Sequence, residues 1–144
     1  MKRLFTVSLV LALAACAGTT QPLAEGKANQ INNVCIVKNP KVMVSGFTDV
    51  LQQRLQYHGI ASTLVDNADT AACPYQLTYT ARRTWNGQMR MARAELRLWE
   101  NQQQIAFAEY KNLSRSSNGI NDTVAEKMNP IIDALLNKKK RVGL

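Results

Sequence analysis

The sequence predicts an α+β fold, a two-layer sandwich in which two helices cover one face of a five-stranded, mostly antiparallel sheet. Its elements are expected in the order strand–helix–strand–strand–strand–strand–helix. A β-branched run, a helical pattern and a second β-branched run follow one another, as in a strand–helix–strand crossover. Three segments of alternating polarity come next, which is typical of an antiparallel meander with one wet face. A second amphipathic segment then completes the helical layer.

The crossover is predicted between residues 34 and 65. Residues 34–37 are continuously apolar and end at Asn39-Pro40, as expected of a buried strand. Ser45 is a suitable cap for the helix that follows. The apolar residues of this helix recur at helical spacing on one face: Phe47, Val50, Leu51 and Leu55. Gly59 is expected to end the helix in the left-handed conformation, and residues 60–65 then form a parallel strand.

The meander is predicted from period-two alternation. In residues 75–82 one face carries Tyr75, Leu77, Tyr79 and Ala81. Asn86-Gly87 is a strong hairpin signal. In the next strand one apolar row, Ala92, Ala94, Leu96 and Leu98, alternates with a second row, Arg93, Glu95, Arg97 and Trp99. A tight turn near Asn101-Gln102 leads to the last strand, residues 105–111.

The last helix is expected after Asp122, which can cap it. Its apolar residues are Val124, Met128, Ile131, Ile132 and Leu135. Pro130 lies inside this pattern, and a proline in a helix interior removes a hydrogen bond and crowds the preceding turn. We therefore predict a kink, or a break into two shorter helices, at this position.

The first sixteen residues have the order of a secretory signal peptide. Lys2 and Arg3 precede a mainly apolar run, residues 4–13, which is too short to span a bilayer. Two alanines and Cys16 follow. The segment Leu13-Ala14-Ala15-Cys16 resembles the lipobox of bacterial lipoproteins. An ordinary signal peptide, cut near Ala15 and leaving Cys16 as a free thiol, is the alternative.

The resemblance implies an address for the chain. Residues 1–15 would be removed, and Cys16 would carry the lipid that anchors the protein to a membrane. Ala17, rather than aspartate, follows the lipidated position, which in this family favours the outer membrane with the protein facing the periplasm. Residues 16–33 are poor in apolar side chains and are expected to form a lipidated flexible tether. Residues 34–144 then form a single periplasmic domain.

Two cysteines remain once Cys16 carries lipid. Cys35 and Cys73 are an even pair in an oxidising compartment, so we predict a disulfide between them. The alternative is a pair of buried, unbonded thiols. No Cys-x-x-Cys motif is present, which argues against a redox site.

The chain is basic, with a formal net charge of +8. An exported, lipidated protein is not expected to meet nucleic acid. Anionic lipid, lipopolysaccharide or an acidic surface of an envelope protein are better partners for this charge. Simple solubility is the alternative explanation for it.

The sequence offers no catalytic set, so we predict that the protein is not an enzyme. Its single histidine, His58, stands at the end of the first predicted helix, where a contact with the last carbonyls is the ordinary role. Neither a metal-ligand cluster nor a cofactor-binding motif is recognised. The sequence contains no Gly-x-Ser-x-Gly motif.

A candidate binding surface is predicted on the sheet instead. Arg93, Arg97 and Trp99 should project from the face opposite the apolar row of their strand. Arginine and tryptophan on one exposed face are typical of protein or glycolipid contacts. The alternative is a solvated face on which the arginines form ion pairs with Glu95, Glu100 or Glu109.

The favoured function is a non-enzymatic binding or scaffolding component of the cell envelope. The order of elements is similar to that of small periplasmic modules in lipopolysaccharide-export and curli-secretion lipoproteins, and Cys35 to Leu113 resembles small uncharacterised Gram-negative lipoproteins. Neither resemblance supplies an activity. The alternative is a carrier or sensor of a lipid or glycolipid, for which small residues could leave room under the helices: Ala92, Ala94, Ala106 and Ala108. Those alanines would otherwise let a helix pack closely.

Overall fold

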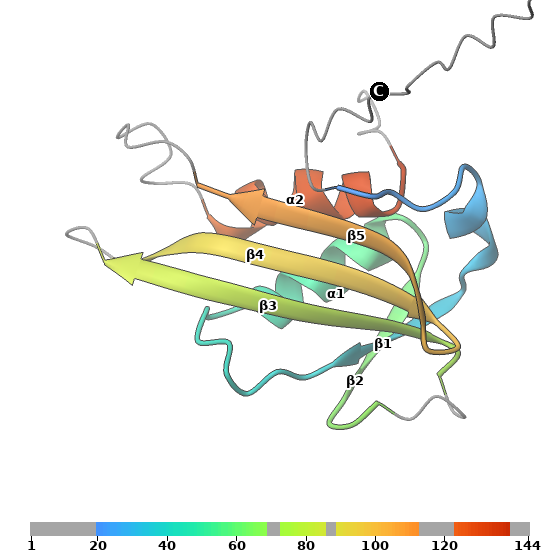
Figure 1. The fold of residues 1–144 in the computed structure, drawn as a ribbon, viewed down its shortest axis with the longest axis horizontal. Coiled ribbons are helices and arrows are strands. Elements are labelled where there is room, and N and C mark those ends of the chain that lie inside the picture. The colour runs from blue at the N-terminus through green and yellow to red at the C-terminus, as the bar shows by residue number, and fades with distance from the viewer. Residues whose placement is uncertain (1–19, 69–72, 86–88, 113–122, 139–144) are drawn as a thin grey trace, which may run out of the picture.

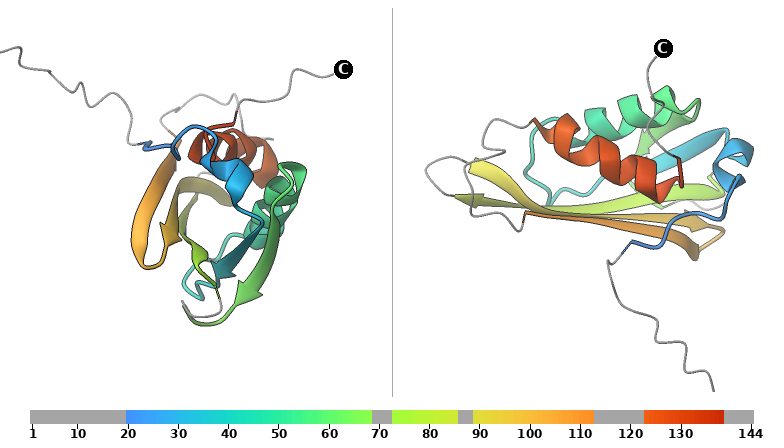
Figure 2. Two further views of the ribbon diagram at one scale, coloured as in Figure 1. Left: turned by 90° about the vertical axis from the view of Figure 1, so that its right-hand side faces the viewer. Right: turned by 90° about the horizontal axis from the view of Figure 1, so that it is seen from above.

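The computed structural model describes residues 20–68, 73–85, 89–112 and 123–138. These residues form a five-stranded sheet with two helices on one face (Figures 1 and 2). The sheet consists of β1 (Asn33–Val37), β2 (Ala61–Val65), β3 (Tyr75–Trp85), β4 (Met89–Glu100) and β5 (Gln103–Lys111). The helices are α1 (Phe47–Tyr57) and α2 (Val124–Leu135), and a short 3-10 helix, η1 (Lys27–Gln30), precedes β1. The predicted α+β class and the order of the strands and α-helices along the chain are confirmed.

The sheet is mixed rather than mostly antiparallel. Its strand order is β2-β1-β3-β4-β5. β1 pairs in parallel with both β2 and β3, whereas the pairings of β3 with β4 and of β4 with β5 are antiparallel. The start of β3 lies beside the middle of β1, and the two strands run in the same direction. This second parallel pairing is what the sequence analysis missed.

The predicted disulfide is present and fixes this entry point. Cys35 lies in β1, and Cys73 lies just before β3. Their Cα atoms are 5.9 Å apart, and 38 positions separate them in the sequence. Cys35 is the register partner of Gln76, so the bond ties the start of β3 to the middle of β1. Closing a loop of this length stabilises the fold by about 4 kcal/mol in the chain-entropy model.

The crossover helix ends as predicted but begins differently. Gly59 has a φ of 78°, the left-handed conformation expected just after a helix. The N-cap residue is Gly46, not Ser45, and no side chain caps the helix. Three residues of the predicted apolar face are buried against the sheet: Phe47, Leu51 and Leu55.

The last helix is one continuous element, so the predicted break at Pro130 is wrong. Its N-cap is Thr123, whose side chain accepts a hydrogen bond from the backbone N–H of Glu126 while the Glu126 side chain accepts one from the backbone N–H of Thr123. This reciprocal pair satisfies two donors that the helix end leaves open. Burial of Met128 and Ile132 against the sheet adds stability to both halves of the helix and outweighs the proline.

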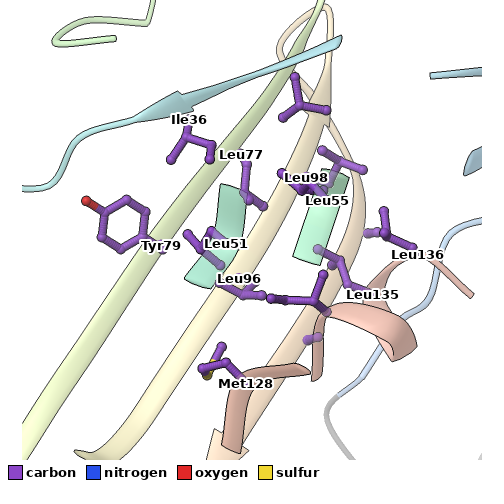
Figure 3. Close-up of a cluster of buried hydrophobic side chains, with 14 of the residues drawn as sticks. Ile36, Leu51, Leu55, Leu77, Tyr79, Leu96, Leu98, Met128, Leu135 and Leu136 are labelled. Atoms are coloured by element: carbon purple, nitrogen blue, oxygen red, sulfur yellow. The ribbon is translucent and has the colours of Figure 1, made fainter. Parts of the chain in front are cut away.

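The core fills the space between the helices and the sheet (Figure 3). The sheet contributes alternate residues of its central strands, among them Ile36, Leu77, Leu96 and Leu98, and Figure 3 shows these side chains facing those of both helices. Ala94, Ala106 and Ala108 are at most 2% exposed, and α2 packs on their strands. The alanine row therefore allows close packing of a helix.

β-Bulges alter the predicted alternation. Arg82 pairs with Arg93 and Arg83 pairs with Met91, which leaves Ala92 as the extra residue of β4. Beyond this bulge the buried position passes to Met91, which is 4% exposed. The assignment of Ala92 to the apolar row is corrected accordingly. A second bulge lies at Ile105, because Leu98 pairs with Ala106 and Trp99 with Gln104.

Residues 20–33 do not behave as a tether. Leu23 and Ile31 are each 2% exposed and belong to the core. Gln21 bridges β5 through two backbone hydrogen bonds with Phe107, of 2.7 and 2.8 Å. The Lys27 ammonium lies 3.2 Å from the Glu100 carboxylate. The few apolar residues of this segment are spaced to reach the core, so the folded part begins before residue 34, and residues 16–19 lie outside the described ranges.

An ion-pair cluster joins the two helices at the surface of the core. Arg54 of α1 donates from Nε to Oδ1 of Asp133 in α2 over 2.7 Å and from NH2 to Oδ2 over 2.5 Å. His58 Nε2 lies 2.6 Å from Asp133 Oδ1, and its side chain is 4% exposed. His58 therefore contacts the opposite helix rather than only the end of its own.

The charge state of Asp133 follows from this cluster. Burial raises the pKa of the carboxyl group, but hydrogen bonds and charge from Arg54 and His58 outweigh burial and hold the pKa below its ordinary value. A group whose pKa is lower in the folded state contributes stability that is complete above its unfolded pKa, near 4, and is lost as the pH falls through the folded value.

We predict that Asp133→Asn lowers the free energy of unfolding at pH 7 by about 2–4 kcal/mol, because Arg54 and His58 lose their anionic partner. Urea titration measures this change. The variant should also lose less stability than the original protein between pH 5 and pH 3. Asp49→Asn, on an exposed part of α1, is the matched control and should shift stability by about 0.5 kcal/mol at most. Equal losses in the two variants would contradict the assigned role of the cluster.

Candidate binding surface

The face of the sheet opposite the helices carries the predicted surface. The strand register places Arg93, Arg97 and Trp99 of β4 on this outer face, opposite the buried row of Ala94, Leu96 and Leu98. Figure 2 shows both helices on the other side of the sheet. The exposed fractions of the Arg93 and Arg97 side chains are 45% and 38%. These two guanidinium groups are therefore about half accessible.

The two arginines share one carboxylate. Arg93 donates to Glu95 Oε1 over 2.8 Å, and Arg97 donates to Glu95 Oε2 over 3.2 Å. The predicted alternative, ion pairing along the sheet, is thus present for Glu95. Glu100 does not take part with these arginines, because it contacts Lys27 and Tyr75.

Glu109 of β5 lies beneath a second pair of cations. Its side chain is 3% exposed. Lys111 Nζ lies 2.7 Å from Glu109 Oε1, and Arg93 donates to Oε2 over 3.1 Å. The hydrogen bond from Lys111 lowers the pKa of Glu109, burial opposes this shift, and Arg93 adds to it, so the net direction is downward. Arg93 consequently bridges two carboxylates on adjacent strands.

Aromatic and amide groups fix the rest of the surface. The Arg97 guanidinium lies over the Phe107 ring, 4.5 Å from the ring centre, and donates to Gln104 over 3.3 Å. Trp99 Nε1 donates to Thr78 Oγ1 over 2.8 Å. Trp99 is therefore anchored to β3, so that only part of its indole is available for contact. This restricts the role that the sequence analysis assigned to it.

Positive charge predominates on the outer face of the meander. On the described parts of β3, β4 and β5 the register places two glutamates on this face, Glu95 and Glu109. It places five basic side chains there: Arg82, Arg90, Arg93, Arg97 and Lys111. The surface thus keeps a local excess of cationic groups after its internal ion pairs are formed. Guanidinium groups are suited to phosphate and carboxylate because their donors match both oxygens of these anions.

The segment after β1 forms a wall beside this surface. Asn39 is fixed by Tyr79, because its backbone N–H donates to Tyr79 Oη and its side-chain amide donates to the Tyr79 carbonyl, each over 3.0 Å. A hollow of about 310 Å³ lies between this segment and the strands, and its charged lining is Lys41, Arg82, Arg93 and Glu95. A neighbouring hollow of about 200 Å³ extends along Thr78, Thr80 and Arg97.

Sequence reasoning missed the contribution of this segment. Asn39-Pro40 indicated only where the first strand ends, and nothing in the local pattern places Lys41 near Arg93. The other aromatic residue of the hairpin, Trp85, is 71% exposed at the projecting end of β3. Register puts it on the helix side of the hairpin with Arg83, so neither residue joins the outer face. The predicted Asn86-Gly87 turn and Cys16 lie outside the described residues.

No family model and no curated protein matches the chain. Two solved structures have a similar arrangement of elements, both of PelC dodecamers from Paraburkholderia phytofirmans. A single-substitution PelC variant is 17% identical, with a TM-score of 0.46, over 78% of this chain and 93% of that chain. The other PelC structure is 15% identical, with a TM-score of 0.45, over 78% of this chain and 94% of that chain.

No group of three or more His, Cys, Asp or Glu side chains in the described ranges is placed to hold a metal ion. Within the same ranges, neither helix has the length and apolar character needed to cross a membrane.

We predict that Thr78→Val lowers the free energy of unfolding by about 1–2 kcal/mol, because the half-buried indole N–H of Trp99 loses its acceptor. Thermal or urea unfolding measures the loss. Thr80→Val, on the same face two residues further along β3, is the control and should have little effect on stability. If Thr78→Val and Thr80→Val had the same free energy of unfolding, the hydrogen bond from Trp99 to Thr78 would not stabilise the protein as described.

Proposed function

We propose that this chain is a small lipoprotein, anchored in the outer membrane and facing the periplasm, that acts as a non-enzymatic binding or scaffolding component of the cell envelope. The Leu13-Ala14-Ala15-Cys16 segment supports the anchor. The Cys35–Cys73 disulfide supports an oxidising compartment, where such bonds persist. In this proposal the membrane is one partner, through the lipid on Cys16, and the sheet supplies contact with a second.

The binding role rests on the outer face of the meander, which no helix of the described residues covers. This face presents half-exposed guanidinium groups, Arg93 and Arg97, which glutamates and Phe107 hold in fixed positions. A rigid, cationic and partly desolvated surface loses little conformational freedom when it binds. Its chemistry fits an anionic partner, such as the phosphate groups of lipid or lipopolysaccharide or the carboxylates of an envelope protein.

A lipid or glycolipid carrier is the second candidate, and it rests on a different hollow. A space of about 510 Å³ opens beside the start of α1, with an apolar lining of Val42, Val44, Phe47 and Leu64. Lys38, Asp66 and Tyr79 also line it, and Lys38 Nζ lies 3.4 Å from Asp66 Oδ1. This combination suits a molecule with an apolar chain and a polar head. Native mass spectrometry of the full chain separates the two candidates, since a carrier would retain a ligand.

We predict that Arg93→Gln combined with Arg97→Gln weakens contact with anionic membranes by about 30-fold. Each basic residue near an anionic surface contributes about 1 kcal/mol, and 1.4 kcal/mol is tenfold. The full chain is inserted through its lipid into neutral vesicles, and capture of phosphatidylglycerol vesicles is followed by light scattering. The effect should shrink as the salt concentration rises.

The matched control removes the same charge from the helix side. Arg83→Gln combined with Lys127→Gln should leave vesicle capture within about twofold of the original protein. If both double variants lost capture equally, only net charge would matter and the surface would be wrongly placed. If the Arg93/Arg97 variant captured vesicles normally but failed to retain a protein from the envelope, the anionic partner would be that protein.

We also predict that Cys16→Ser abolishes the anchor. Cells that express the original chain and take up a radiolabelled or alkyne-tagged palmitate should label it, and the protein should fractionate with outer membranes. The serine variant should take up no label and leave the membrane fraction, because a serine hydroxyl does not replace the thiol in this modification. Retention of the label in Cys16→Ser would contradict the lipoprotein assignment.

A further inference from the structure

The two edges of the sheet differ in how they are protected. β5 is covered by the bridge from Gln21 and interrupted by the bulge at Ile105, and it ends at Lys111. β2, at the other edge, has the sequence ASTLV, with neither a charge nor a proline, and its five residues pair with β1 without a register shift. Figure 2 shows β2 at the margin of the molecule. Regular, uncharged edges of this kind are templates for another strand.

The backbone of β2 presents a defined set of free groups. The N–H of Ala61 donates to Asn32, and the carbonyl of Val65 accepts from Lys38, each over 2.9 Å toward the β1 side. In a parallel pair, the N–H and C=O groups of one residue point the same way and alternate along the strand. Ala61, Thr63 and Val65 therefore face β1, whereas Ser62 and Leu64 direct their backbone groups outward.

Side chains around this edge are polar but mainly uncharged. A hollow of about 650 Å³ lies between α1 and β2, and its lining includes Gln52, Gln53, Gln56 and Ser62. An amide side chain both donates and accepts, so a surface of amides is complementary to a copy of itself. Asp49 is the charged residue of this lining. The cationic groups that dominate the outer face are absent from it.

We propose that two copies of this chain pair antiparallel through β2, about a two-fold axis that passes beside Thr63. Ser62 of each copy then lies opposite Leu64 of the other, and both pairs exchange two backbone hydrogen bonds. Thr63 faces Thr63 of the second copy as the non-hydrogen-bonded pair between them. This register uses every outward backbone group of Ser62 and Leu64 and joins the two sheets into one of ten strands.

Charge favours a second copy over a different partner at this edge. Basic residues outnumber acidic ones in this chain, also after residues 1–15 are removed, so two copies repel each other over most of their surface. The β2 strand carries no charge of its own, so two copies can approach there without a like-charge contact across the pairing. Cross-strand Thr–Thr contacts add to such pairings. The amide side chains of α1, Gln52, Gln53 and Gln56, can each donate to and accept from a symmetric copy.

Cysteine crosslinking of the full chain tests the register. In the proposed dimer the two Thr63 Cα atoms lie about 4.5 Å apart, within disulfide reach, so Thr63→Cys should give a reducible covalent dimer under mild oxidation. Ala61→Cys is the matched control, because its thiol is on the same face and equally exposed. Its symmetric partner lies four positions away along the strand, about 13 Å, which is beyond disulfide reach.

A backbone variant separates pairing from folding. In the Thr63→Cys background, Ser62→Pro removes an outward N–H that β1 does not use, so the crosslinked fraction should fall at least tenfold while the melting temperature stays nearly the same. Equal crosslinking of the Ala61 and Thr63 variants would overturn the proposal. So would a Thr63→Cys adduct with a different protein, or no adduct at all.

Discussion

The bidentate pair between Arg54 and Asp133, completed by His58, holds α1 and α2 together on one face of the sheet. The helices bury Phe47, Leu51, Leu55, Met128 and Ile132 against the strands, and the ion pair fixes how they lie side by side. Its polar groups are almost fully enclosed, so removing any one of them leaves a buried polar partner unsatisfied. With both helices committed to this face, no helix of the described chain is left to cover the other.

The properties of the outer face follow from that arrangement. A sheet face without a second layer is exposed to water and needs polar side chains. Here arginine and glutamate side chains supply them, and their aliphatic parts shield the strands. Glu109 shows the extent of this shielding, because its side chain is almost completely covered. The side chains that cover the outer face of the strands also form the cationic surface. The same residues therefore contribute both to the stability of the sheet and to the proposed binding. The helices also leave the β2 edge open. The packing of both helices on one face therefore determines both proposed contact sites, the outer face of the meander and the β2 edge.

Much of the fold was predictable because its signals are local. Period-two alternation identified β3, β4 and β5, and Asn101 and Gln102 adopt the positive φ angles of the predicted turn. The Cys35–Cys73 disulfide was predictable because only these two cysteines remain when Cys16 carries lipid. The failures concern effects that act over long distances in the sequence: the parallel pairing of β3 with β1, the core positions of Leu23 and Ile31, and the continuity of α2 through Pro130. For the surface, alternation placed Arg93 and Arg97 correctly and Glu109 was among the predicted ion-pair partners, but only the three-dimensional structure brings Lys41 to them.

The central claim is that the outer face of β4 meets a partner in the envelope, and site-specific photocrosslinking in cells tests it most directly. A photoreactive amino acid is placed at position 93, 97 or 99, and adducts in the membrane fraction are identified by mass spectrometry. The account predicts adducts from positions 93 and 97, with fewer from the anchored position 99 and none from position 83 on the helix side. Adducts from position 83 alone, or equal adducts from all four positions, would contradict it.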